Sequence, residues 1–181
     1  QYLICTQCHL IFLTPQQQIS LSDERAVYEN HENSPEHSGY VEFLNHLVVP
    51  FSQWIPKGAQ GLDFGCGPGP TLSTLMEKKG FQTQNYDPIY FPDSSLLENQ
   101  CDFITSTEVV EHFRNPLKDW GRLFSLARNT AWIGIMTRLV PKEIPFKEWW
   151  YHRDPSHISL YQSKTFEWIA TQFSVFNCVR L

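Results

Sequence analysis

Three glycines at alternate positions follow a short apolar run and precede a helical pattern in this sequence. They are Gly65, Gly67 and Gly69. Because glycine has no side chain, the backbone at these positions can take positive φ angles and approach a bound nucleoside at the carboxyl end of a strand. The loop therefore indicates a site for a ligand that contains a nucleoside.

Two acidic residues flank this loop. Asp63 precedes Gly65 by two positions, and Asp87 follows Gly69 by eighteen positions, at the end of the second expected strand. A carboxylate at that strand end can accept hydrogen bonds from both ribose hydroxyls. A dinucleotide fingerprint would need a glycine at position 70, where the sequence has Pro70. A nicotinamide-dependent oxidoreductase is therefore disfavoured.

A second group of aromatic and ionisable residues lies nearer the end of the sequence. Its members are Trp149, Trp150, Tyr151, His152, Asp154 and His157. A loop at this position can cover the carboxyl ends of a sheet, where a substrate would bind. His157 has an intrinsic pKa near neutrality, which suits a general base, and Asp154 could orient its ring. A hydrogen-bonded structural histidine is the open alternative.

These residues must be positioned by alternating strands and helices. Apolar runs predict strands over residues 59–64, 81–86, 102–106 and 130–137. Apolar spacing and caps predict helices over residues 71–79, 115–127 and 163–171, and residues 173–179 are expected to form a last, antiparallel strand. This alternation predicts an α/β fold with a Rossmann-like, mostly parallel sheet and helices on both faces.

The third strand of that sheet is expected to be shortened or lost. Asp87 and Asp102 are 15 positions apart, whereas one βαβ unit takes about 30 residues. The chain between them is therefore too short for a strand and two crossovers.

The first fifty residues do not show the alternation of strands and helices that the rest of the sequence predicts. Short apolar runs at residues 2–4 and 10–13 flank Cys5 and Cys8, which predicts a hairpin whose turn carries half of a metal knuckle. Two helices are expected after it, over residues 20–31 and over residues 40–48, the second ended by Pro50.

The central motifs resemble those of class I S-adenosylmethionine-dependent methyltransferases. The glycine loop with Asp63 is similar to their first motif, Asp87-Pro88 to their ribose-binding acid motif, and Thr107 to Phe113 to the segment that lines the cofactor near its sulfonium. The resemblance implies S-adenosylmethionine as cofactor, held by Asp63, Gly65, Cys66, Gly67, Gly69, Asp87, Pro88, Thr107, Glu108 and Tyr40. With the third strand reduced, the adenine pocket is expected to use Pro88, Ile89 and Tyr90.

The resemblance extends to uncharacterised bacterial methyltransferases with an N-terminal zinc ribbon. The matching motifs are Cys5-x-x-Cys8, Tyr28-x-x-His31-x-Asn33, Gly39-Tyr40-x-x-Phe43-Leu44 and Tyr151-x-x-Asp154-Pro155-x-His157. In that group another CxxC precedes this pair. We expect no metal on the present chain, and zinc only if residues before Gln1, or His9 and His31, complete the set.

Two regions follow from this resemblance. Residues 1–50 are expected to form a truncated zinc-ribbon head with a helical lid, to which Tyr28, His31 and Tyr40 would belong. Residues 51–181 are expected to form the methyltransferase core. For Tyr40, a place in the apolar core is the open alternative.

The implied reaction is methyl transfer to an unidentified acceptor, expected to be a small molecule. The candidates for catalysis are His157, Asp154, Tyr151 and His112. Glu111 and His112 could face the acceptor, and a helix-surface or capping role for one of them is the alternative. Cys66 is expected to be a small loop residue rather than a nucleophile, because no histidine lies at local spacing. The alternative function is a catalytically silent module that binds the cofactor and docks through its zinc ribbon.

Composition excludes several other classes of protein. The 181 residues, 41% of them hydrophobic, suit one globular domain. A net charge of −5 has the wrong sign for nonspecific binding to DNA. No apolar stretch approaches the roughly 18 residues of a membrane helix, and no signal peptide opens the sequence. Five cysteines, with only one pair at a diagnostic spacing, favour a reducing cytoplasm. The oligomeric state is left open.

Overall fold

A four-stranded parallel sheet forms the centre of the computed structural model, which describes residues 1–28, 34 and 36–175. The strands are β3 (Gln60–Phe64), β4 (Gln82–Tyr86), β5 (Cys101–Thr107) and β6 (Ala127–Met136). Their order is β4-β3-β5-β6, and all three pairings are parallel. The predicted α/β fold with a Rossmann-like sheet is therefore confirmed.

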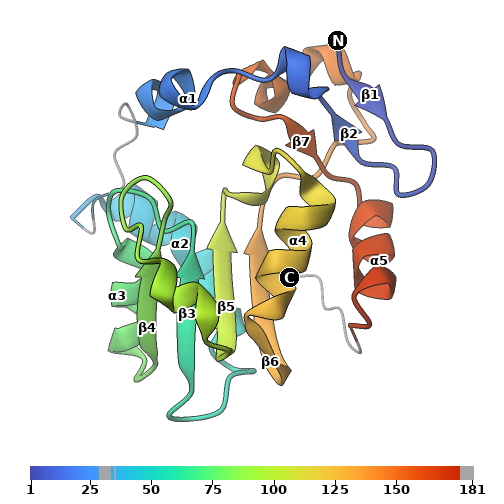
Figure 1. Ribbon diagram of the computed structural model, residues 1–181. Helices are drawn as coiled ribbons and strands as arrows, with labels where there is room; N and C mark the ends of the chain where they lie inside the picture. The colour runs from blue at the N-terminus through green and yellow to red at the C-terminus, as the bar shows by residue number, and fades with distance from the viewer. Residues whose placement is uncertain (29–33, 35, 176–181) are drawn as a thin grey trace.

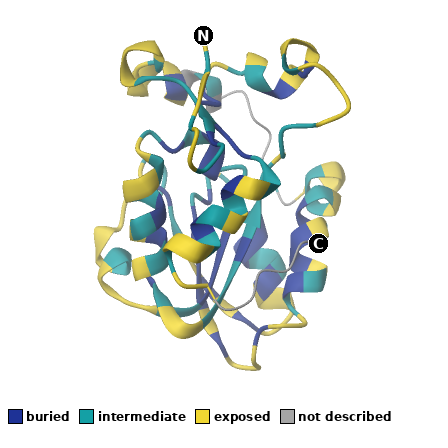
Figure 2. Ribbon diagram, turned by 90° about the vertical axis from the view of Figure 1, so that its right-hand side faces the viewer, coloured by how far each residue is buried: buried dark blue, intermediate teal, exposed yellow. Residues whose placement is uncertain are grey.

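Helices cover both faces of this sheet (Figure 1). They are α2 (Ser38–Phe51) and α3 (Thr71–Lys78) on one face, and α4 (Pro116–Ser125) and α5 (Ser163–Gln172) on the other. Successive strand residues point to opposite faces, and β5 shows this clearly. Phe103 belongs to the core under α2 and α3, whereas Ile104 belongs to the core under α4 and α5. Figure 2 shows these buried layers between exposed outer surfaces.

The expected start of α4 is confirmed, whereas its end and the end of α2 differ from the prediction. Helix α4 ends at Ser125 rather than at residue 127, because Ala127 already begins β6. The side chain of Asn115 accepts the N–H of Lys118 at 3.3 Å, and Pro116 takes the first helical position. Helix α2 does not end at Pro50 but continues to Phe51. Proline lacks only its own N–H there, and the N–H of Ser52 still reaches the carbonyl of Val48 at 3.1 Å.

The connection from β4 to β5 contains no third strand. It holds an isolated antiparallel bridge between Asp87 and Phe91 and a 3-10 turn, η2 (Ser94–Glu98). Strand β4 is consequently an edge of the sheet. The expected shortening or loss of the third strand is confirmed as a loss.

A small antiparallel sheet lies beyond the carboxyl ends of the parallel strands (Figure 1). Its strands are β1 (Leu3–Ile4), β2 (Ile11–Phe12) and β7 (Ser159–Leu160), in the order β1-β2-β7. The hairpin around Cys5 and Cys8 was expected, whereas β7 was not. The pairing of β2 with β7 joins the first residues of the chain to a segment close to its end.

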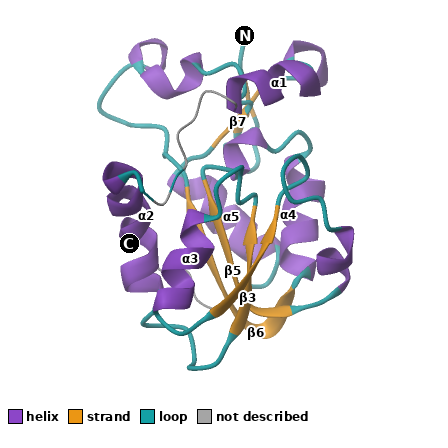
Figure 3. Cartoon of the chain, turned by 90° about the vertical axis from the view of Figure 1, so that its left-hand side faces the viewer, coloured by secondary structure: helices purple, strands orange, loops and turns teal. Residues whose placement is uncertain are grey.

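Short helical segments complete the fold, and Figure 3 shows α1 above the sheet. They are α1 (Leu21–Tyr28), η1 (Pro15–Gln17), η3 (Val110–His112), η4 (Phe146–Glu148) and η5 (Trp150–Arg153). Helix α1 confirms the start of the helix expected over residues 20–31, whose last three residues lie outside the described part. No described helix is long and apolar enough to span a membrane.

The strand expected over residues 173–179 does not begin where the sequence suggests. Phe173 caps α5, because its N–H donates to the carbonyl of Ile169 at 3.0 Å, and Ser174 has a positive φ of 55°. This turn keeps both residues out of an extended strand. Residues 176–181 lie outside the described part of the chain.

Candidate functional site

The chain turns sharply at two of the three loop glycines. Gly65 and Gly67 have φ angles of 81° and 66°. A Cβ atom on Gly65 would lie 2.5 Å from Val109, so only glycine fits this position. Gly69, the third glycine of the loop, does not have a positive φ. It precedes Pro70, whose ring favours an extended conformation in the preceding residue.

Asp87 binds the glycine loop through its side chain. Its Oδ2 atom accepts the N–H of Gly67 at 3.2 Å, and its Oδ1 atom accepts the N–H groups of Ile89 and Tyr90 at 2.8 and 3.0 Å. The carboxylate is therefore fixed against the turn, with Pro88 exposed beside it. The sequence correctly placed this acid at the carboxyl end of β4, next to the loop after β3.

Asp63 lies behind the loop and is 2% exposed. The hydroxyl of Thr105 donates to its Oδ1 atom at 2.9 Å. Burial raises the pKa of Asp63 to about 7, with the charge of Asp87 adding to the effect. Burial and the nearby charges of Asp63 and Glu108 raise the pKa of Tyr40 to about 12. Tyr40, on α2, also packs against the apolar cluster under α2 and α3. Its place in the cofactor site therefore stays a prediction, beside the alternative of a core residue.

Cys66 occupies the loop as a buried thiol. Burial raises the pKa of this thiol further above its ordinary value, and the charges of Asp63 and Asp87 act in the same direction. A thiolate is the nucleophilic form of cysteine, so these surroundings oppose a nucleophilic role. The expectation of a small loop residue agrees with this chemistry.

The segment after β5 brings two carboxyl groups to the same end of the sheet. Thr107 ends β5 opposite Met136, and Glu108 has a positive φ of 52°. The N–H of Glu108 donates to the carbonyl of Met136 at 2.8 Å. Burial and the neighbouring carboxyl of Glu111 raise the pKa of Glu108 to about 7. A non-glycine residue held at positive φ in such a segment is frequent at functional sites.

Glu111 is completely buried and hydrogen-bonded on both oxygens. The hydroxyl of Tyr151 donates to Oε1, and the hydroxyl of Thr137 donates to Oε2 at 3.0 Å. The Tyr151 hydroxyl also lies 3.3 Å from Oε2 of Glu108. Sequence reasoning missed Thr137. Its place directly after β6, at the carboxyl end of a parallel strand, was the signal that could have indicated it.

Two histidine rings lie against this group. Nδ1 of His157 is 2.7 Å from the carbonyl of Tyr151, and Nδ1 of His112 is 2.9 Å from the carbonyl of Ser156. The ring centroids are 5.0 Å apart. Burial lowers the pKa of His157, and His112 lowers it further. The structure therefore brings His112, Tyr151 and His157 together as the sequence suggested.

Asp154 lies beside His157, three positions before it in sequence. Its Oδ2 atom is 3.9 Å from Nε2 of His157, while Oδ1 accepts the N–H and the hydroxyl of Ser156. Hydrogen bonds from Ser156 and the nearby histidines hold the pKa of Asp154 below its usual range, against an opposing effect of burial. All four expected catalytic candidates are thus neighbours.

Cys5 and Cys8 stand at the turn between β1 and β2. Backbone N–H groups of Cys8 and Gln7 lower the pKa of the Cys5 thiol, and burial raises that of Cys8. The expectation that this pair holds no metal on the present chain, and zinc only if further ligands complete the set, stays a prediction. Of the other residues expected to join the head and lid, His31 and the side chain of Tyr28 lie outside the described part.

Comparison with known proteins agrees with this geometry. Residues 36–174 match the sequence model of a family described as a methyltransferase domain. CalO1, a methyltransferase in calicheamicin biosynthesis whose structure is an SAH-bound form, is similar in fold, with a TM-score of 0.55 and 14% identity. The match covers 84% of this chain and 52% of CalO1, so the chain spans about half the length of that relative.

YcgJ from Bacillus subtilis is also similar in fold, with a TM-score of 0.50 and 16% identity over 71% of this chain and 68% of YcgJ. No curated protein matches the sequence. The family match covers far more than half of the chain and includes the parallel sheet and the glycine loop. This chain belongs to the family of methyltransferase domains and has the class I fold.

Proposed function

We propose that this chain binds S-adenosylmethionine at its glycine loop and transfers the methyl group to a small-molecule acceptor. The observation that carries the proposal is the turn at Gly65 and Gly67, fixed by the carboxylate of Asp87 at the carboxyl ends of parallel strands. The family match supports methyl transfer, and the SAH-bound form of CalO1 supports this cofactor.

The chemistry of the surrounding groups fits such a ligand. Asp63 is a buried carboxyl group and Glu108 is a partly buried one, and the pKa of each is raised to about 7. A cation beside them would stabilise their charged forms. When bound, S-adenosylmethionine supplies a methyl carbon activated by a positively charged sulfonium. Asp87 would accept hydrogen bonds from the ribose hydroxyls, and the two glycines would leave room for the ligand against the backbone.

The acceptor side is supported by the neighbouring group of His112, Tyr151, Asp154 and His157. These side chains come from the segments after β5 and before β7, next to Glu108. Methyl transfer requires mainly that the acceptor be aligned and that water be excluded. Tyr151 and His157, both buried, are suited to hold an acceptor rather than to bind solvent.

Calorimetry with S-adenosylmethionine or its demethylated product tests cofactor binding. We expect binding to the present chain, weakened at least about tenfold by Asp87→Asn, because the amide cannot accept hydrogen bonds on both atoms. Asp93→Asn is the matched control, since Asp93 is an exposed N-cap on the same connection and asparagine also caps. Absence of binding, or equal affinity for the Asp87 variant, contradicts the proposal.

Transfer itself needs a separate measurement. Incubation with cofactor carrying a labelled methyl group and an extract of small metabolites should move the label into a small molecule. Binding without any transfer or slow cofactor hydrolysis would instead favour the silent module described above.

A further inference from the structure

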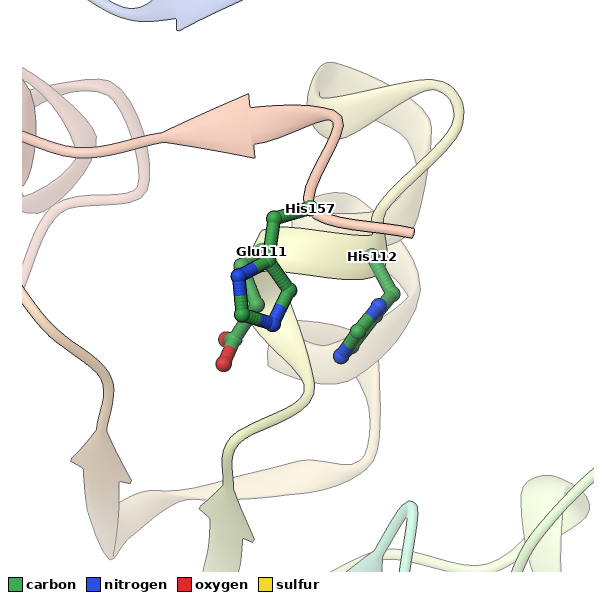
Figure 4. A group of neighbouring side chains, drawn as sticks. All are labelled: Glu111, His112 and His157. Carbon is green, nitrogen blue, oxygen red and sulfur yellow. The ribbon is translucent and has the colours of Figure 1, made fainter. Parts of the chain in front are cut away.

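Glu111, His112 and His157 form a group with the composition of a metal site. One ligand atom from each side chain lies within 4.8 Å of the others. Among the described residues, this is the one group of three or more histidine, cysteine, aspartate or glutamate side chains that lie this close together. Glu111 and His112 belong to η3, and His157 lies just before β7. Figure 4 shows the three side chains extending to one side with their polar ends close together.

The backbone fixes which nitrogen of each ring carries the hydrogen. Nδ1 of His112 faces the carbonyl of Ser156, and Nδ1 of His157 faces the carbonyl of Tyr151. A carbonyl can only accept, so each Nδ1 must donate, and in a neutral ring Nε2 then carries the lone pair. Metal-binding histidines are usually oriented by this same contact between the second ring nitrogen and a carbonyl.

Hydrogen bonds also fix the side chain and the backbone of Glu111. Tyr151 and Thr137 donate to its two carboxylate oxygens, and its backbone carbonyl accepts the N–H of Ile158 at 2.9 Å. The last bond joins η3 to the segment that carries His157. No ion pair with Lys or Arg is found at Glu111 among the described residues. A cation bound beside this buried carboxyl group would stabilise its charged form.

We propose that Glu111, His112 and His157 bind a divalent transition-metal ion through one carboxylate oxygen and two Nε2 atoms. Metal bonds of about 2.0–2.2 Å keep any two ligand atoms within about 4.4 Å of each other. One possible ligand atom of each side chain lies within 4.8 Å of the other two, so the side chains must rotate inward to reach bonding distance of one ion. Three protein ligands leave further coordination positions for a substrate.

This inference rests on the proposed function where it concerns the substrate. Tyr151 links Glu111 to Glu108, and Glu108 lies beside Tyr40 at the glycine loop. An acceptor bound to the metal would therefore sit next to the cofactor. The chemical class that fits is a compound with a hydroxyl oxygen, because a metal ion lowers the pKa of a bound hydroxyl.

The methyl transfer to this oxygen then needs no basic side chain of the protein. The bound hydroxyl releases its proton to water, and its oxygen forms a bond to the methyl carbon as the carbon–sulfur bond breaks. The sulfur keeps the electron pair and becomes a neutral thioether. In this arrangement His157 is a metal ligand rather than the general base that its sequence position suggested.

Electron paramagnetic resonance with Mn²⁺ alone tests the site on the full chain after dialysis against a chelator. Mn²⁺ suits imidazole and carboxylate sites and has little affinity for the thiols of Cys5 and Cys8. We expect one Mn²⁺ bound per chain, seen as loss of the free-ion signal. Glu111→Gln and His112→Gln should each weaken binding at least about tenfold. His46→Gln is the control, since it removes an exposed imidazole on α2.

Two outcomes overturn the proposal. One is no loss of the free Mn²⁺ signal at millimolar concentrations, and the other is unchanged binding by both cluster variants. Should the variants fail to fold, pulsed measurements on the unmodified chain decide instead. Coupling of Mn²⁺ to imidazole nitrogen is expected, and its absence counts against the site.

The metal site and the cofactor site can fail independently. Asp87→Asn should bind S-adenosylmethionine more weakly and keep its affinity for Mn²⁺. A chain that binds Mn²⁺ through the cluster but no S-adenosylmethionine would remove the proposed function and leave the metal site standing. A chain that binds S-adenosylmethionine but no Mn²⁺ would contradict only the metal site.

Discussion

A buried carboxyl group at the end of β3 makes stability depend on pH. Asp63 has its pKa raised from 3.8 to about 7 in the folded chain, chiefly by burial. A raised pKa means that the folded chain holds this proton more tightly than the unfolded chain does. Stability contributed by this group is therefore present below pH 4, falls as the pH rises toward 7, and changes no further above that.

Asp63→Asn should remove this loss. Its amide oxygen can still accept the Thr105 hydroxyl, while no charge has to be buried. At pH 8 and without cofactor we expect the variant to be more stable than the parent by between about 1 and 4 kcal/mol, with the difference vanishing toward pH 4. Urea unfolding at several pH values measures this.

Asp102→Asn is the matched control on the neighbouring strand. The N–H of Gln60 and the guanidinium of Arg128 hold the pKa of Asp102 below its usual range, so this substitution should act in the opposite direction at pH 8. A parent more stable than the Asp63 variant at pH 8 would contradict the assigned cause.

Residues of the site differ in how far the sequence could predict them. The glycine loop and Asp87 form a pattern of residue types at fixed spacing that indicates a nucleoside site. The structure places them in contact. The contacts of Glu111 with Thr137 and Tyr151 join residues 26 and 40 positions away, and no local pattern encodes such a meeting. The folded backbone also determines which ring nitrogen of His112 and of His157 faces a carbonyl, and no sequence pattern indicates this.

At the scale of elements, the turn after β3 packs against the segment after β5. Gly65 has a φ of 81° and would place a Cβ 2.5 Å from Val109, whereas Gly80, at the end of α3, has a φ of 89° and open space around it. Both positions carry the backbone cost of a side chain at positive φ, about 1–2 kcal/mol. A side chain at Gly65 would in addition overpack the contact with Val109, which typically costs about 1–3 kcal/mol of stability.

Gly65→Ala should therefore destabilise the fold more than Gly80→Ala does. We expect the Gly80 variant to lose about 1–2 kcal/mol and to bind the cofactor normally, and the Gly65 variant to lose about 2–5 kcal/mol and to bind it poorly. Thermal unfolding combined with calorimetry checks both points. Equal losses for the two variants would show that the contact with Val109 is easily relieved.

Elements were predictable where periodicity extends over several residues. The strands and helices of the core satisfy this, and their bounds lie within a few residues of those expected. Strand β7 has two residues and forms only by pairing with β2, which lies about 150 positions earlier. A segment of two residues has no detectable period, so pairing decides its conformation.

At the scale of the whole molecule, the first residues of the chain share a core with its sheet. Leu10 is 8% exposed and belongs to the same apolar cluster as Leu62, Trp120 and Tyr161. The N–H of Leu13 donates to the carbonyl of Ile158 at 2.9 Å. These contacts favour a single folding unit, in which the expected head over residues 1–50 and the rest of the chain unfold together. The other arrangement is a head that unfolds alone.

Leu10→Ala distinguishes these two arrangements. All six tryptophans lie after residue 50, so the main tryptophan fluorescence transition follows the unfolding of that region. Within one cooperative unit, a cavity at Leu10 should destabilise the entire molecule by about 2–5 kcal/mol and shift the fluorescence and far-ultraviolet dichroism transitions together. Leu3→Ala on β1 is the control, since Leu3 is 44% exposed and should cost less than about 0.5 kcal/mol. A head that unfolds alone would instead leave the main fluorescence transition of the Leu10 variant where it is in the parent, preceded only by a smaller change from Trp120 and Trp149, which pack near the head.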